Sequence, residues 1–173
     1  SIPADSKGKA RMLVKENCIL AGVEVSKEVF VTIDPELTVE LLMSDGQKAR
    51  PGDIVLYVSG YRQSILKAER LVLNIIQRMS GIATNTNMYV SKLEGLNTKI
   101  LDTRKTTPGF RFLEKEAVRI GGGINHRMGL YDMIMLKDNH IEFAGGVVNA
   151  ISSVQAYLKK TGRKLKIEIE ARN

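Results

Sequence analysis

The sequence predicts a mixed α/β fold in two parts, and three patterns support this class. Between residues 8 and 60, apolar and polar residues alternate in short runs, which is the period of strands with one solvent-exposed face. From Ser64 the apolar spacing changes to that of an amphipathic helix. From Thr98 onward, strand-like and helix-like segments alternate over short links. That order favours parallel strands, either in a barrel or in an open sheet.

The first part is expected to be a small, mostly antiparallel sheet. Its strands are predicted in four short runs, residues 9–15, 18–25, 38–43 and 54–58. Asp45-Gly46 and Pro51-Gly52-Asp53 separate the last two runs and favour turns. Because strand alternation alone carries no site, this part is interpreted as a scaffold.

A helix is predicted from Ser64, as its N-cap, to Gly81, and a second, weaker helix from about residue 82 to residue 93. We therefore expect one domain over residues 1–80 and another over residues 81–173. On periodicity alone, Arg70 of the first helix is an ordinary solvated charge.

In the second part, strands are predicted over residues 98–103, 132–137 and 165–170, and helices over residues 112–118 and 146–160. The last helix is expected to turn Val147, Ile151, Val154 and Leu158 inward and to end at Gly162. Ligands of such folds bind at the carboxyl ends of the strands. The residues at these ends are polar: Arg104 and Lys105, then Lys137, then the acids Glu168 and Glu170.

Composition favours a small anionic ligand. The net charge is +7 from 26 Lys and Arg less 19 Asp and Glu, while aromatic residues make up only 5% and Trp is absent. A single-strand nucleic-acid binder would interleave more aromatic residues, so no nucleic-acid partner is expected. The lone cysteine excludes an internal disulfide, and the apolar runs are too short to cross a membrane. The chain is expected to be soluble and cytoplasmic.

Residues 101–140 hold both histidines and the densest group of cations. Seven cations lie between Arg104 and Lys137, against three acids. Arginine offers a planar fork for carboxylates and lysine a point charge for phosphates, so these loops suit a polyanion, although charges on surface loops remain an alternative. The amides of Gly121 to Gly123 could approach an oxyanion, but a flexible connector would have the same sequence. His126, beside a cation, is the better site candidate, and His140 belongs to a run that could simply cap or turn the chain.

Several multi-residue motifs in this chain resemble one known family. They occur in the same order and spacing over nearly the whole chain: Ala68-Glu69-Arg70, Ser80-Gly81-Ile82-Ala83-Thr84, Asp102-Thr103-Arg104-Lys105-Thr106-Thr107-Pro108-Gly109, Glu114-Lys115, Gly121-Gly122-Gly123, Asn125-His126-Arg127 and Lys137-Asp138-Asn139-His140. The family is that of the quinolinate phosphoribosyltransferases, which are type II phosphoribosyltransferases.

The resemblance implies an α/β protein with an N-terminal, open β-sandwich-like α+β domain followed by an incomplete α/β barrel. It implies phosphoribosyl transfer from phosphoribosyl pyrophosphate to quinolinate with Mg²⁺ as cofactor. The products would be nicotinate mononucleotide, pyrophosphate and CO₂, in NAD biosynthesis. It also implies a homodimer or a hexamer of dimers.

The resemblance further assigns roles to individual residues. Arg104, His126, Arg127 and Lys137 would line the quinolinate site, with Lys105 at the pyrophosphate donor. Arg70 would reach the neighbouring subunit's site. Lys105, Lys137 and Glu170 would be catalytic, and Glu170, or Glu168, would hold the metal.

Two alternatives stay open at this point. One is a relative with another acceptor, such as a molybdate-operon homologue, and the other is a non-catalytic anion- or RNA-binding module. The resemblance also implies that the chain lacks the later barrel strands. We therefore expect the isolated chain to be inactive and to expose an unpaired parallel strand edge.

Overall fold

The computed structural model describes residues 2–171, so the outermost residues of both predicted domains, 1 and 172–173, lie outside the described part. The chain divides into two compact units, Ser1–His126 and Arg127–Asn173. The elements of the first unit are β1 (Lys7–Leu13), β2 (Cys18–Ile19), α1 (Val23–Ile33), β3 (Thr38–Leu41), β4 (Lys48–Ala49), β5 (Ile54–Tyr61), α2 (Arg62–Lys92) and α3 (Arg111–Ile120). Those of the second unit are β6 (Met133–Leu136), α4 (Asp138–Phe143), α5 (Val147–Thr161) and β7 (Lys166–Ile169).

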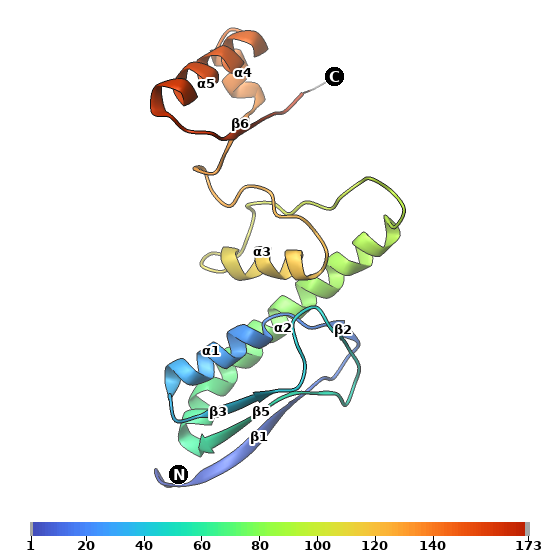
Figure 1. Cartoon of the computed structure of the whole chain (residues 1–173), viewed down its shortest axis with the longest axis vertical. Coiled ribbons are helices and arrows are strands. Elements are labelled where there is room, and N and C mark those ends of the chain that lie inside the picture. The colour runs from blue at the N-terminus through green and yellow to red at the C-terminus, as the bar shows by residue number, and fades with distance from the viewer. Residues whose placement is uncertain (1, 172–173) are drawn as a thin grey trace. The chain divides into compact units, whose positions relative to one another are not determined.

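The predicted antiparallel sheet is confirmed in the first unit. Its strand order is β1-β5-β3, and Val58 of β5 pairs with Ala10 on one side and Val39 on the other. Helices α1 and α2 pack on this sheet (Figure 1). The shared core includes Phe30 of α1, Leu56 of β5 and Val72 of α2. Each such apolar side chain contributes about 1.5–3 kcal/mol when fully buried.

The prediction that residues 8–60 are all β is wrong for α1. The apolar run from Cys18 to Val25 is as compatible with a strand as with the start of a helix, so its local pattern does not distinguish the two. In the structure only Cys18 and Ile19 pair, and the chain then turns through Gly22 at φ 98°. The helix has no capping side chain of its own at this point. Instead Asp45 accepts a hydrogen bond from the Val23 amide at 2.8 Å, a partner 22 residues away that no local pattern reveals.

The predicted break at Gly81 is also wrong, because α2 is a single 31-residue helix from Arg62 to Lys92. A single glycine is tolerated inside a helix when the buried face of the helix continues on both sides of it. Here that face continues beyond Gly81. Met79, Ala83 and Thr86 all lie on the buried face of the helix. Helix α2 thus crosses residue 80, and the first compact unit ends at His126.

The region between α2 and α3 contains no strand over residues 98–103, contrary to prediction. Within the described residues it forms only a parallel bridge between Leu101 and Ile124. The predicted short helix that follows is confirmed as α3, which packs against α2 through Ala117 and Ala83 in one core cluster.

In the second unit, β6 and β7 pair in parallel as predicted, with Met135 opposite Glu168. The helix α5 is confirmed and ends at Gly162 in the left-handed region, φ 66°. Val147 was expected to face inward but is 45% exposed, whereas Ala150 is buried. The short helix α4, which the sequence reading treated as a cap or turn, begins directly after Lys137.

No helix within residues 2–171 is both long and apolar enough to span a membrane.

Candidate functional site

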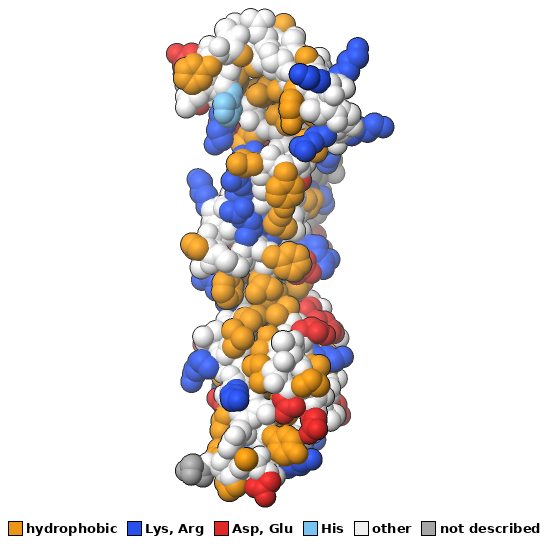
Figure 2. Space-filling model, turned by 90° about the vertical axis from the view of Figure 1, so that its left-hand side faces the viewer, with side chains coloured by type: hydrophobic (Ala, Val, Ile, Leu, Met, Phe, Trp, Pro, Cys, Tyr) orange, Lys and Arg blue, Asp and Glu red, His pale blue; other side chains and the backbone are white. Residues whose placement is uncertain are grey.

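The predicted site residues fall into two sets, one in each compact unit. Arg70, Arg104, Lys105 and His126 belong to the first unit, and Arg127, Lys137, Glu168 and Glu170 to the second. On the face of the molecule drawn in Figure 2, lysine and arginine side chains form several separate groups with hydrophobic side chains between them.

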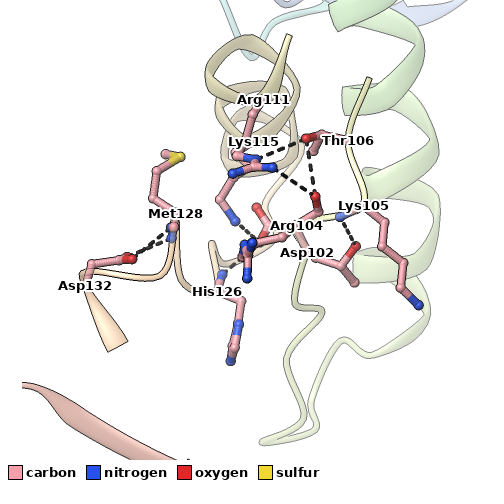
Figure 3. Close-up of polar contacts among 11 residues, drawn as sticks. Asp102, Arg104, Lys105, Thr106, Arg111, Lys115, His126, Met128 and Asp132 are labelled. Carbon is pink, nitrogen blue, oxygen red and sulfur yellow. Dashed lines mark hydrogen bonds and ion pairs between the residues drawn. The ribbon is translucent and has the colours of Figure 1, made fainter. Parts of the chain in front are cut away.

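The centre of the first set is the segment Asp102–Thr107, named here the cation loop, which carries Arg104 and Lys105. It precedes α3, and side chains of that helix contact it at its start and its middle (Figure 3). Another side chain of α3 contacts the end of the loop. The loop has little secondary structure of its own. Its conformation therefore depends on these side-chain contacts.

The start of the cation loop is fixed by a buried ion pair. Lys115 of α3 contacts Asp102 Oδ1, and only 1% of the Lys115 residue is exposed. The same Oδ1 atom accepts a hydrogen bond from the His126 amide at 2.8 Å. With its amide nitrogen turned toward the acceptors, Asn125 donates to Asp102 Oδ2 at 2.9 Å and to the Lys115 carbonyl at 2.7 Å. Asp102 thus joins the cation loop, α3 and the segment that carries His126.

The end of the loop is fixed by the neighbouring residue of the helix. Glu114 is 8% exposed and accepts a hydrogen bond from the Thr107 amide at 3.2 Å. Arg78 of α2 donates to the same carboxylate at 2.7 Å and to the Thr107 hydroxyl at 3.0 Å. Burial acts to raise the pKa of Glu114, but the hydrogen bonds from Arg78 and Thr107 outweigh it, and its pKa lies below the ordinary value. Glu114 is therefore a carboxylate at neutral pH.

The middle of the loop is held by Arg111, whose guanidinium donates to the Thr106 hydroxyl at 3.2 Å and to the Arg104 carbonyl at 3.4 Å. Lys105 is exposed, and its side chain points away from those of Arg104 and His126 (Figure 3). Among the described residues, the Nε atom of Arg104 is buried without a hydrogen-bond partner. A buried donor of this kind lowers the stability of the folded state unless a ligand supplies an acceptor.

The glycine triplet does not offer free amides to an oxyanion. The amide of Gly121 donates to the Ala117 carbonyl and that of Gly123 to the Val118 carbonyl, both at 3.0 Å. A Cβ atom on Gly121 would lie 2.5 Å from the Ala83 carbonyl oxygen. The triplet therefore ends α3 and allows its close approach to α2, rather than binding a ligand.

Arg70 lies on the exposed side of α2. It lines a groove of about 660 Å³ whose walls come from β1 and the following residues 14–18, and from α2 as far as Met88. The lining residues of this groove do not include the cation loop. Arg70 and Arg104 thus occupy different places in the first unit.

In the second unit, the carboxyl ends of the parallel strands bring a cation and an acid together, as their positions predict. Lys137 directly follows β6, Glu170 directly follows β7, and Lys137 Nζ lies 3.5 Å from Glu170 Oε1. The two side chains are 49% and 47% exposed. Both groups are therefore accessible to a ligand as well as to each other.

The other residues of this set have separate contacts. Arg127 donates to the Met135 sulfur at 3.3 Å. His140 accepts the Lys137 amide hydrogen on Nδ1 at 3.0 Å, which matches the capping role left open for it.

No cluster of three or more metal-ligating side chains occurs within residues 2–171. Glu168 and Glu170 nevertheless offer carboxylate oxygens at or beside one strand end. Mg²⁺ is commonly held by one or two protein carboxylates together with substrate phosphates. These carboxylates are therefore groups of the kind that binds Mg²⁺.

Local sequence patterns assign no role to Asp102, Glu114 or Lys115. A signal for the latter two was present, because Glu114 and Lys115 lie in the same short helical pattern as the buried Ala117. A charged residue that helical periodicity places inward requires a partner. The identity of that partner depends on tertiary contacts.

Fold and site together define a two-part α/β protein that presents cations on a loop in one unit and a cation at a strand end in the other. The comparisons with known proteins give the family. Residues 1–80 match the N-terminal domain and residues 82–173 the C-terminal domain of the quinolinate phosphoribosyl transferase family. The chain belongs to that family.

Related proteins align over nearly the whole chain. The chloroplastic nicotinate-nucleotide pyrophosphorylase (carboxylating) of Arabidopsis thaliana is 48% identical over 99% of this chain and 49% of its own length. A probable nicotinate-nucleotide pyrophosphorylase of Synechocystis is 41% identical over 96% of this chain and 56% of its own length. The chain thus spans about half the length of the curated relatives it matches.

The crystal structure of NadC from Streptococcus pyogenes matches with a TM-score of 0.91 at 42% identity, over 99% of this chain and 60% of that one. The nicotinate-nucleotide pyrophosphorylase of Francisella tularensis matches with a TM-score of 0.88 at 41% identity. These matches confirm the predicted fold class, an N-terminal sheet domain followed by an incomplete α/β barrel whose sheet is not closed.

Proposed function

We propose that the full-length gene product transfers the phosphoribosyl group of phosphoribosyl pyrophosphate to quinolinate and decarboxylates the product. Nicotinate mononucleotide, pyrophosphate and CO₂ would result, as a step of NAD biosynthesis. The observation that carries this proposal is the cation loop, where the buried Arg104 Nε atom has no acceptor among residues 2–171. Family membership supports it.

Quinolinate has two neighbouring carboxylates, and arginine binds such groups through a planar fork of donors. We propose that Arg104, His126, Arg127 and Lys137 bind these carboxylates. Each charge-assisted hydrogen bond contributes about 1.5–3 kcal/mol when it is desolvated. Lys105, which is exposed, would contact the pyrophosphate of the donor.

The reaction needs orientation and charge stabilisation rather than a covalent nucleophile. The ring nitrogen forms a bond to the anomeric ribose carbon while the bond from that carbon to pyrophosphate breaks, and the electron pair leaves with pyrophosphate. The alkylated ring is then positively charged, so it accepts the electron pair of the carbon–carboxylate bond as CO₂ departs. A solvent proton completes the product. Holding the reactants in place can supply up to about 7–11 kcal/mol of the barrier.

Glu170, with Glu168 as the other candidate, would hold Mg²⁺ at the end of β7. Bound there, the ion would neutralise charge on the departing pyrophosphate. Lys137 lies 3.5 Å from Glu170, so it would help to orient that carboxylate.

The test is an assay of the full-length gene product with quinolinate, phosphoribosyl pyrophosphate and Mg²⁺, following nicotinate mononucleotide by chromatography. Arg104→Ala should lower kcat/KM on the order of 100-fold or more. Arg119→Ala is the matched control, because Arg119 is exposed and pairs with Glu116 on the same helix. No product from the full-length protein, or undiminished product from Arg104→Ala, would contradict the proposal. We expect the 173-residue chain alone to give no product.

We further propose a homodimer, alone or within a hexamer, in which Arg70 of one protomer serves the site of its partner. Mixing two inactive variants tests this idea. Arg70→Ala and Arg104→Ala proteins, unfolded and refolded together, should regain about a quarter of wild-type activity through mixed dimers, since half of the dimers are mixed and each has one intact site. Mixtures that stay inactive although the subunits exchange would contradict the role of Arg70. The cytoplasmic location remains a prediction.

A further inference from the structure

We propose that Glu114 and Lys115, two neighbouring residues of α3, are positioning residues that hold the two ends of the cation loop in the geometry that binds the dicarboxylate substrate. The proposal rests on the proposed function, because it takes quinolinate as the ligand of Arg104.

The geometry supports a clamp. Lys115 contacts Asp102 at the start of the loop, and Glu114 accepts the Thr107 amide hydrogen at its end. Arg104 and Lys105 lie between these two fixed points. Lys115 and Glu114 carry opposite charges. Lys115 therefore pairs with a carboxylate, and Glu114 accepts a hydrogen bond from an amide.

Lys115 has a second effect through Asp102. The carboxylate atom that it contacts also accepts the His126 amide hydrogen. The buried pair thereby fixes the backbone of His126 and the start of the cation loop, two residues before Arg104. Arg104 and His126 are both ligand residues in the proposed site. Errors of about 1 Å in such positions can cost on the order of 100-fold in rate.

Neither Lys115 nor Glu114 is exposed enough to contact the ligand. Lys115 is 1% exposed and Glu114 is 8% exposed. Both side chains are already engaged, Lys115 by Asp102 and Glu114 by Arg78 and Thr107. Their influence on a ligand would therefore pass through the loop.

The experiment uses the full-length gene product and three variants. Glu114→Gln weakens the grip on the loop end. The double variant Asp102→Asn with Lys115→Met removes both charges of the buried pair, so it avoids the unpaired charge that could prevent folding of a single variant. Glu116→Gln is the matched control on the same helix, because Glu116 pairs with Arg119 and not with the loop.

Three readouts separate positioning from simple stability. Calorimetry gives the Kd for quinolinate without turnover, thermal unfolding gives the folded fraction, and hydrogen exchange reports on the amides of residues 102–107 and 126. We expect Glu114→Gln and the double variant to bind quinolinate about 10- to 100-fold more weakly while folded, with faster exchange confined to the loop region. Glu116→Gln should bind and exchange as wild type does.

Two results would overturn the proposal. One is wild-type affinity in both folded variants despite faster loop exchange, and the other is unchanged loop exchange in both. Failure of the wild-type protein to bind quinolinate would contradict the proposed function and, with it, the substrate named here. Hydrogen exchange would then still decide whether α3 holds the loop.

Discussion

The cation loop of the first unit and the strand-end pair of the second use the same kinds of charges in opposite ways. Lys115 and Asp102 are almost fully buried, whereas Lys137 and Glu170 are each about half exposed. A buried pair is costly to break, because removal of one partner leaves a desolvated charge. An exposed pair stabilises little and leaves both groups free to meet a ligand. The buried charges of Lys115 and Asp102 thus stabilise the structure of the site, whereas the exposed charges of Lys137 and Glu170 would bind its ligands.

The largest effect is expected from Lys115→Met in the full-length gene product. It leaves the Asp102 carboxylate buried beside an apolar side chain, and the free energy of unfolding should fall by about 3–5 kcal/mol. Urea denaturation followed by circular dichroism measures the loss. Adding Asp102→Asn should recover most of it, because the unpaired charge is then gone. A double variant no more stable than the single one would contradict this account of the pair.

A smaller effect is expected from Glu114→Gln, at about 1.5–3 kcal/mol, because the charge-assisted bonds from Arg78 and Thr107 weaken. The loss should depend on pH. The folded-state pKa of Glu114 lies below its ordinary value of 4.5, so the stability it contributes is fully present above about pH 4.5 and disappears as pH falls through the folded pKa. The difference in unfolding free energy between wild type and variant should therefore narrow as pH falls from 7 toward 3. A gap that widens toward low pH would contradict the assignment.

Disturbing the packing of α3 on α2 should lower the free energy of unfolding by a similar or slightly smaller amount than Glu114→Gln. Gly121→Ala would place a methyl group 2.5 Å from the Ala83 carbonyl oxygen and 2.8 Å from Thr86 Cβ. We expect a loss of about 1–3 kcal/mol from overpacking. Gly81→Ala is the control, because a Cβ atom there meets nothing within 4 Å and the residue lies inside α2. It should raise stability by about 0.4–1 kcal/mol, and thermal unfolding of both variants would show opposite shifts.

The smallest effect on stability is expected at the strand-end pair. Glu170→Gln should change the free energy of unfolding by less than about 1 kcal/mol, and 0.5 M salt should remove most of that difference by screening. The same variant should nevertheless lose product formation if Glu170 holds the metal. A loss of stability as large as that of Lys115→Met would erase the distinction between the two regions.

Much of the arrangement could be predicted from local patterns. Alternation placed β1, β3 and β5, helical spacing placed α3 and α5, and strand order placed Lys137 and Glu170 at one edge of a parallel pair. The predictions were wrong where one local pattern is compatible with two different structures. The run from Cys18 to Val25 suits a strand as well as the start of α1, and Gly81 suits a helix end as well as a helix interior.

By itself, the sequence determined the fold class, the family and the positions of the cations along the chain, because periodicity and motif spacing are properties of neighbouring residues. Only the tertiary structure decided which charges are buried and what they hold. Asp102 meets Lys115 across 13 residues and Arg78 meets Glu114 across 36. Such pairs form when packed helices bring distant residues together, and burial then gives their charges a free energy that no local pattern contains.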